Sequence, residues 1–579
     1  MADRIAAPRR ADTKIAVRSP ARTARFEPAT FVWILLCGIL LFLVINPLFQ
    51  LIVGSFQAPG SGTFSFANYV SAFGRSRNVA ALVNSLFYGA AVTVLSICFA
   101  VPIAFAVSRT DMPAKRAVRA MILGAFITPS YLGAIAWILL AGPNAGWLNR
   151  AWTTLTGASA GLFDVYSFSG LVLVTALYAF PYVFVFTSDA LDLISSEMEE
   201  AAQILGASRL VTTFRITLPL ITPAITAGGI IVFLDTLALF GTPAIIGLPA
   251  RLNLMTLQLW GFFEFPQKPE AAAAYSVPLI AITCLLFALQ RAVLGRKSYV
   301  ALTGKSPGRS LIQAGPARWI LLGWSLFVCS LAVIFPFAAL AQAAFARAWG
   351  RGFSISNLTL GNFHYLLFEQ QNAQQTIWNT FIYASATACL SVALALGVAY
   401  VVSRRLVPFS GALTLLCTAP FVIPGIVLAI AFYAAYAPPP FALYGTATIL
   451  VLAFTTRFLP IAYVNCLAAL KAINPELEDA VRTVGGTRLT ALVRVVAPIL
   501  KKSLAGSWIL VFIPAVRELS TAIFLVTAQT RVISVMLLDL SEDGNFETLS
   551  ALGFVLLGAT ILIVLIAYRL LGRDLMLKA

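Results

Sequence analysis

One stretch of the sequence decides the fold, and it reads Glu199-Glu200-Ala201-Ala202-Gln203-Ile204-Leu205-Gly206, continuing to Arg215-Ile216-Thr217-Leu218-Pro219. From Met198 to Leu205 the apolar residues recur with the period of a helix that has one apolar and one acidic face. Gly206 suits the left-handed conformation that ends such a helix, and Pro219 suits the first turn of a following helix. The stretch therefore predicts a short amphipathic helix, a sharp turn and a second helix.

The same stretch returns 279 residues later as Glu478-Asp479-Ala480-Val481-Arg482-Thr483-Val484-Gly485, running on to Pro498. A loop that was amphipathic only because it lies between membrane helices would not repeat at a fixed spacing. Seven of 21 aligned positions are identical without a gap: Glu199/Glu478, Ala201/Ala480, Gly206/Gly485, Arg209/Arg488, Leu210/Leu489, Arg215/Arg494 and Pro219/Pro498.

These residues carry a resemblance to a known family. The order Glu200-Ala201-Ala202, three residues, Gly206, nine residues, Ile216, one residue and Leu218-Pro219 resembles the "EAA" signature of the membrane subunits of bacterial ABC importers. The resemblance implies that each loop forms a coupling helix that docks in a groove of a separate ATPase subunit. The second copy departs from the signature at four positions: Asp479, Val481, Val495 and Ala497.

The bulk composition is that of a polytopic membrane protein. The chain has 579 residues, of which 60% are hydrophobic and 11% charged, whereas about 25% charged is usual in soluble domains. All seven cysteines lie inside apolar runs, so they are expected to be membrane-core residues. Twelve apolar runs are about long enough to span a bilayer: 31–53, 79–108, 119–141, 170–190, 221–247, 273–295, 318–342, 377–402, 411–436, 443–469, 503–527 and 548–570. The run 31–53 is too long for a cleaved secretory signal and lacks a small-residue cleavage site.

The basic residues predict the orientation. Of the 40 lysines and arginines, 30 lie in the termini, the central segment and the loops on the signature side, and 8 lie in the opposite loops. This distribution places both termini in the cytoplasm. The net charge of +17 is then explained by topology, and nucleic acid is not expected as a partner.

The repeat extends over both halves, at an offset of 295 residues upstream of the signature and 279 downstream. The 16 extra residues of the first half are assigned to the external 142–169 loop. Six helices per half give a parallel repeat with its pseudo-twofold axis along the membrane normal. The expected domains are a disordered basic tail (1–30), a first permease half (31–295), a linker (296–317), a second permease half (318–570) and a cytoplasmic C-terminus (571–579).

The candidate site residues form two groups. The ATPase-coupling group comprises Glu199, Glu200, Ala201, Ala202, Gly206, Pro219, Glu478, Asp479, Ala480, Gly485 and Pro498. The second group comprises ionisable residues within apolar runs, where a charge is costly and usually functional: Asp235, Arg517 and Glu518, with Arg457 nearby. Two readings stay open for the second group, namely a lining of the substrate path or an ion pair of Arg517 that holds the halves together; a third is that the charges are interfacial.

Two segments resemble a nucleotide site or a metal site but are not expected to form one. Gly304-Lys305-Ser306 resembles the end of a phosphate-binding loop, but Tyr299 stands where the loop needs a glycine and no strand precedes it. The chain is therefore expected to bind no cofactor itself, with ATP and Mg²⁺ held by a partner ATPase. His364 is the only histidine, and a surface position is expected rather than a metal site.

The architecture is most similar to the fused permeases for ferric iron, and less specifically to those for thiamine or aminoethylphosphonate. This resemblance implies an all-α transport subunit, not an enzyme, in the bacterial inner membrane, in contact with lipid, two ATPase copies and a periplasmic substrate-binding protein. Asp235 and Glu518 offer oxygen ligands for a hard cation, whereas Arg517 would suit an anion better. One rival is a secondary transporter or channel, in which the two signature loops would have no role. The other is a membrane scaffold, against which the buried charges at matching depth argue.

Overall fold

The computed structural model describes residues 28–58, 62–194, 202, 204–295, 311–352, 354–407 and 410–571. Within these ranges the regular structure is helical, with three isolated bridges between short extended segments. The expected all-α class is therefore confirmed. The tail at 1–27, the linker residues 296–310 and the C-terminal residues 572–579 lie outside the described residues.

The first half is organised around α4, which packs against α8 and α11. Two adjacent glycines of α11 allow this close approach, because a Cβ on Gly228 would lie 3.1 Å from the backbone of α8 and one on Gly229 would lie 3.2 Å from Ile97 of α4. Small residues at helix contacts are typical of membrane bundles. The main helices are α3 (Ala67–Phe73), α4 (Ser76–Arg109), α5 (Lys115–Ile127), α6 (Ser130–Ala141), α7 (Trp147–Thr156), α8 (Phe168–Leu193), α10 (Arg209–Thr212), α11 (Leu218–Ala238), α12 (Met255–Gly261) and α13 (Pro269–Gly295).

The second half repeats this arrangement, with α17 packed against α20 and α24. Equivalent hydroxyls anchor the short outer helices: Ser85 accepts a hydrogen bond from the Met255 N–H of α12 (2.8 Å), and Thr380 accepts one from the Ile533 N–H of α25 (2.8 Å). The main helices are α16 (Gly361–His364), α17 (Gln371–Ser403), α18 (Ser410–Thr418), α19 (Gly425–Tyr436), α20 (Ala447–Lys471), α21 (Glu476–Thr483), α22 (Arg488–Ala491), α23 (Ala497–Ile499), α24 (Lys501–Val516), α25 (Ile533–Glu542) and α26 (Phe546–Leu571).

Two expected spans are not single straight helices. The run 119–141 bends by 103° between α5 and α6, and the run 411–436 bends by 113° before α19. Pro129 and Pro424 stand at these breaks, and a proline forces the residue before it out of the helical region. A third bend of 77° separates residues 488–499 from α24. The described residues thus contain nine continuous helices long enough to span a membrane, or twelve if each bent pair is one span.

Two further runs end earlier than expected. Helix α11 ends at Ala238 rather than at residue 247, and α24 ends at Val516 rather than at residue 527. In the second case, the polar residues that follow Val516 bond to other elements: Arg517 donates to the Phe126 carbonyl of α5, and Glu518 accepts from Arg457 of α20. Hydropathy alone could not distinguish this apolar but non-helical segment from a continuation of the helix.

The N-terminal helical segment of each half crosses to the other half. These segments are α1 (Pro28–Leu40) with α2 (Asn46–Ser55), and α14 (Ala317–Cys329) with α15 (Phe335–Ala344). Helix α2 packs against α19 of the second half, and α15 packs against α6 of the first half. Each half therefore depends on the other for part of its packing.

Wide π turns interrupt four helices at equivalent places in the two halves. Each turn ends two residues before a proline, which has no N–H to donate and whose ring clashes with the carbonyl four residues earlier. The prolines are Pro47, Pro219, Pro336 and Pro498. Pro219 and Pro498 thus lie inside a continuous helical run rather than at its first turn.

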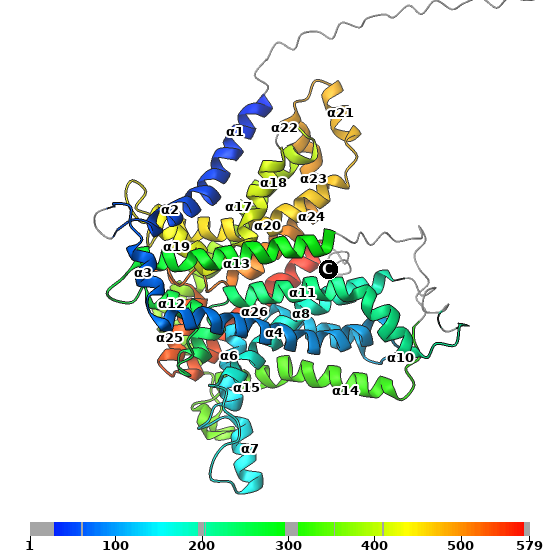
Figure 1. The fold of residues 1–579 in the computed structure, drawn as a ribbon, viewed down its shortest axis with the longest axis vertical. Helices are drawn as coiled ribbons and strands as arrows, with labels where there is room; N and C mark the ends of the chain where they lie inside the picture. Colours follow the sequence, from blue (N-terminus) through cyan, green and yellow to red (C-terminus); the bar gives the residue numbers. More distant parts are fainter. Residues whose placement is uncertain are drawn as a thin grey trace, which may run out of the picture.

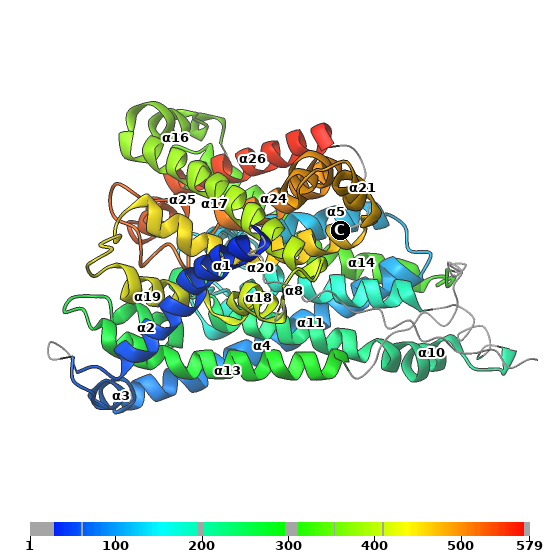
Figure 2. The same cartoon turned by 90° about the horizontal axis from the view of Figure 1, so that it is seen from above.

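The two ends of the molecule carry different elements. In Figures 1 and 2, α3 and α25 lie toward the left of the molecule and α10 and α21 toward the right. On the right-hand side, α10 and α21 lie apart from each other. Both signature loops therefore lie on the same side of the molecule, as the parallel repeat predicts.

The described end of the linker docks on the first half. Ile312 forms a parallel bridge with Thr110, and the Asp111 carboxylate accepts a hydrogen bond from the Ala314 N–H (2.8 Å). Arg318 lies 3.5 Å from the same carboxylate. The Ala314 hydrogen bond lowers the pKa of Asp111 below its ordinary value, so the contribution of this carboxylate to the docking is present at neutral pH and is lost as the pH falls through the lowered pKa.

Candidate functional site: signature loops and intramembrane charges

Both signature loops turn at a left-handed glycine. Gly206 and Gly485 each have φ of +85°. The turn is closed by the same backbone bond in both copies, from Ala207 N–H to Ala202 O (3.0 Å) and from Gly486 N–H to Val481 O (2.9 Å). The expected helix, turn and second helix are therefore confirmed in the second copy; Glu199, Glu200 and Ala201 lie outside the described residues.

The apolar side chains of the loops point away from the protein. Val484 is 84% exposed and its counterpart Leu205 is 87% exposed. Leu477 and Ala480, which continue the helical period of apolar residues in the second copy, are also exposed. Exposed apolar faces of this kind are typical of interaction surfaces.

An acidic residue of the second loop points inward instead. Glu478 is 6% exposed, and its carboxylate accepts hydrogen bonds from Arg404 Nε (2.8 Å) and from the Tyr400 hydroxyl (2.8 Å). Both partners belong to the end of α17. Hydrogen bonds in which both groups are charged are among the strongest in proteins, so Glu478 fixes α21 to this helix end.

The neighbouring Asp479 is open to solvent, with its side chain 67% exposed and a 3.4 Å contact to Arg482. The structure thus separates two residues that the sequence placed in one coupling group. Glu478 positions the loop from inside, whereas Asp479 and Ala480 are on the accessible side. In the first half, Arg109 matches Arg404 and is buried, but Phe105 replaces Tyr400.

The buried ion pair of the membrane region joins Glu518 to Arg457. Arg457 Nε lies 2.9 Å from Glu518 Oε2, and Oε1 accepts bonds from the N–H (2.9 Å) and the hydroxyl (3.0 Å) of Thr521. Gly425 makes room for the guanidinium, because a Cβ there would lie 2.6 Å from Arg457 Nη1. This differs from one of the two readings left open by the sequence, in which Arg517 would form the ion pair.

Arg517 holds the halves together in another way. Its Nη1 donates to the carbonyls of Phe126 (2.6 Å) and Ile127 (3.1 Å) in the first half. These carbonyls are at the end of α5, where the break at Pro129 leaves them without helical partners. A cation at a helix C-terminus also interacts favourably with the helix dipole.

Asp235 of α11 completes the charged group. Its side chain is exposed, and Arg457, Arg517 and Glu518 all act on it electrostatically. Among the described residues it forms no salt bridge within 4.0 Å. Asp235 of the first half therefore lies within electrostatic range of two cations and a carboxylate of the second half.

Comparison with known proteins identifies the chain. Residues 79–299 match the family described as the binding-protein-dependent transport system inner membrane component. The chain is 28% identical over 544 residues to the ferric transport system permease protein FbpB of Actinobacillus pleuropneumoniae, covering 91% of this chain and 76% of that protein. The chain is a fused permease of an ABC importer. This permease is a multi-pass membrane protein with two membrane halves in one chain.

Two further matches are a second relative and a solved structure. The permease is 29% identical over 517 residues to a putative ferric transport system permease protein FbpB of Haemophilus influenzae, covering 86% of this chain and 78% of that protein. A solved structure of a bacterial transporter for the acidic polysaccharide alginate aligns with 18% identity and a TM-score of 0.37, over 44% of this chain and 96% of the other.

Sequence reasoning did not identify Arg404 and Tyr400 as the partners of Glu478 in the permease. Arg404 was visible as a repeat partner of Arg109, at the end of equivalent helices. Nothing in the sequence paired it with Glu478, which is 74 residues away. His364, by contrast, is exposed and contacts Glu369 (2.9 Å), as expected of a surface residue.

Gly206→Val in the permease is expected to abolish transport and ATPase association while the protein still inserts. A Cβ at either turn glycine would meet nothing within 4 Å, so the cost is backbone strain of about 1–3 kcal/mol. Gly485→Val is expected to do less harm, because the second signature is more degenerate. Asparagine tolerates the left-handed region, so Gly206→Asn is the matched control.

The measurement is co-purification of the ATPase together with substrate uptake. Retained activity in Gly206→Asn would tie the defect of Gly206→Val to backbone conformation. An equal or reversed severity of the two valine variants would show that the loops are ranked wrongly.

Proposed function

We propose that this permease forms the translocation path of an ATP-driven importer and receives its energy from a separate ATPase at the two signature loops. The observation that supports this most is the orientation of α21, whose apolar side chains are exposed while Glu478 is buried. A secondary transporter would have no partner for such a surface. ATP and Mg²⁺ are assigned to two copies of the ATPase, one for each loop.

We infer ferric iron as the substrate, delivered by a periplasmic binding protein. The support comes from the relatives named as ferric transport permeases over most of this chain. The charged group agrees with a passing cation: Glu518 is occupied by Arg457 and Thr521, and only Asp235 presents an exposed carboxylate. Oxygen ligands suit a hard cation, and a single exposed carboxylate would interact with it only weakly.

The decisive experiment reconstitutes the permease and its ATPase in proteoliposomes. Candidate binding proteins are added, loaded with ferric iron, thiamine or aminoethylphosphonate. Stimulated ATP hydrolysis and uptake with the iron-loaded protein alone is the expected result. Stimulation by one of the organic ligands and none by iron would overturn the substrate while leaving the importer function intact.

Both termini are proposed to lie in the cytoplasm of a bacterial inner membrane, with α10 and α21 on the cytoplasmic side. In a cysteine-free background, cysteines at Leu155 and Leu360 are expected to react with an impermeant thiol reagent in intact cells, because both side chains are exposed at the outer loops. Cysteines at the exposed Ser208 and Thr487 are expected to react only after permeabilisation. The reverse pattern would invert the topology.

A further inference from the structure

The outer end of the first half contains a cavity of about 660 Å³ that is lined by four cations. They are Arg75 and Arg77 at the start of α4, Arg251 before α12 and Lys268 before α13. All four side chains are exposed, and among the described residues none of them forms a salt bridge. Glu264 is the only carboxylate in the lining. Half of the eight cations counted in the outer loops thus lie around one cavity.

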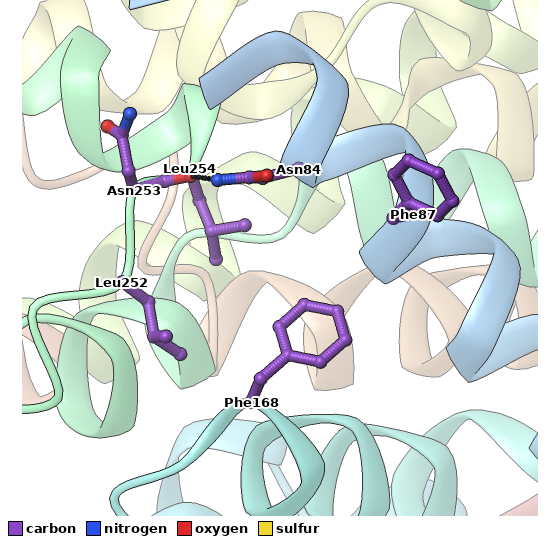
Figure 3. Close-up of a pocket in the computed structure, with 6 residues that line it drawn as sticks. All are labelled: Asn84, Phe87, Phe168, Leu252, Asn253 and Leu254. Atoms are coloured by element: carbon purple, nitrogen blue, oxygen red, sulfur yellow. Dashed lines mark hydrogen bonds between the residues drawn. The ribbon is translucent and has the colours of Figure 1, made fainter. Parts of the chain in front are cut away.

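The backbone that presents these cations is held in place. Asn253 Nδ2 donates to the Arg77 carbonyl, and Asn253 O accepts from Asn84 Nδ2 (3.0 Å), the bond drawn in Figure 3. Arg251 itself has φ of +53°, a left-handed conformation that is rare for a residue with a side chain. Such strain persists only where the surroundings enforce it, and it gathers at functional sites.

The second half keeps this scaffold but not its charge. Asn379, the counterpart of Asn84, donates to the carbonyls of Gln529 (2.9 Å) and Arg531 (3.1 Å) before α25. At the offsets that relate the two halves, none of the positions that correspond to the four cations carries a cation: they are Gln370, Asn372, Thr530 and Glu547. The neighbouring Arg531 is paired with Asp539 at 3.1 Å. The fold therefore does not require the cations, and a separate role must explain them.

The lining resembles a protein interface more than a small-molecule pocket. Small-molecule sites are mostly apolar with a few polar groups, whereas interfaces are enriched in arginine and aromatic residues. Here the lining contains the aromatic residues Trp260, Phe262 and Phe265 beside the arginines, and Phe265 is 97% exposed. An exposed phenylalanine beside unpaired arginines is the composition of an interface hot spot.

We propose that this basic cavity is the docking site for an acidic surface of the soluble substrate-binding protein, on the first half only. The proposal rests on the proposed function, which supplies a partner at the outer face. Because the corresponding positions of the second half carry no cation, the two halves offer the partner different charges, and this difference fixes the orientation in which the partner docks. Complementary charges of this kind act mainly on the association rate and on its salt dependence.

The test compares two double variants of the reconstituted permease with its ATPase. Arg75→Gln with Arg77→Gln removes two cations of the cavity, and Arg347→Gln with Arg351→Gln removes two exposed cations from the outer loops of the second half. The first variant is expected to slow association of the iron-loaded binding protein roughly tenfold at low salt and to flatten its salt dependence. The second is expected to leave both unchanged, and basal ATP hydrolysis should be equal in all three proteins.

Other outcomes have separate meanings. Equal association in both variants would overturn the docking site while leaving the importer function standing, because wild-type stimulation would persist. Competition by inorganic phosphate for the cavity, with unchanged binding-protein association in the first variant, would make it a small-anion site and also overturn the proposal. A wild-type permease that no binding protein stimulates would overturn the docking site together with the proposed function.

Discussion

Arg457→Leu is expected to lower the yield of folded permease sharply. The substitution leaves the Glu518 carboxylate, which is buried and 2.9 Å from Arg457 Nε, without its cation. Removing one partner of a buried ion pair typically lowers the folding stability by about 3–5 kcal/mol, because the remaining charge stays desolvated. The Thr521 bonds to Glu518 are not sufficient to replace a cation. The measurement is the amount of monodisperse protein after solubilisation, with its thermal unfolding midpoint.

The double variant separates the ion pair from other causes. Adding Glu518→Leu to Arg457→Leu is expected to restore much of the yield, since an apolar pair often replaces a buried ion pair without loss. Arg517→Leu should be milder and should not be rescued by Glu518→Leu, because Arg517 binds carbonyls of α5. Rescue of Arg517→Leu by Glu518→Leu would contradict the pairing seen in the structure.

The charged group shows what sequence could and could not predict. The apolar runs and the repeat offsets predicted that Asp235 and Glu518 lie at similar depth in the membrane. In the structure, Asp235 is within electrostatic range of Glu518, Arg457 and Arg517. Of the two readings left open, the ion pair of Arg517 does not hold, because Arg517 binds carbonyls of α5 and Arg457 is the partner of Glu518. The direction of the Arg517 side chain depends on the end of α24 at Val516, which hydropathy does not reveal.

The bent spans have a similar explanation. Pro129 and Pro424 were visible as repeat partners, but the apolar residues around them continue without interruption. A hydropathy window averages over the proline and predicts one helix, whereas the missing N–H and the restricted preceding residue break it. The carbonyls freed at the first break then bind Arg517, so the bend and the contact between halves have one cause.

The signature loops were predictable in shape and not in orientation. Gly206 and Gly485 correctly gave the turn in both copies, and the helical period correctly gave the helix of the second copy. The same period cannot say which face is buried, and in a soluble protein the apolar face would be. Here Val484 is exposed and Glu478 is buried, because the chain offers Glu478 an arginine and a hydroxyl at the end of α17.

Glu478→Gln is expected to uncouple ATP hydrolysis from transport without preventing insertion. The change weakens two bonds that fix α21 to α17, of which the arginine bond joins two charged groups. Losing a charge-assisted bond costs about 2 kcal/mol, which corresponds to a roughly thirtyfold change in the occupancy of the fixed orientation. The readouts are uptake and ATP hydrolysis in the same proteoliposomes, and their ratio measures coupling. Insertion and ATPase association are measured separately.

Asp479→Asn is the matched control, since it neutralises an adjacent carboxylate that is exposed and held only by Arg482 at 3.4 Å. Its effect is expected on ATPase affinity and not on the ratio of transport to hydrolysis. The exchanged pair Arg404→Glu with Glu478→Arg is expected to recover part of the coupling, because the charges can meet again in the opposite order, although Tyr400 then loses its acceptor. If Glu478→Gln instead lowered ATPase affinity and left the transport ratio intact, Glu478 would be a docking residue rather than the residue that positions α21.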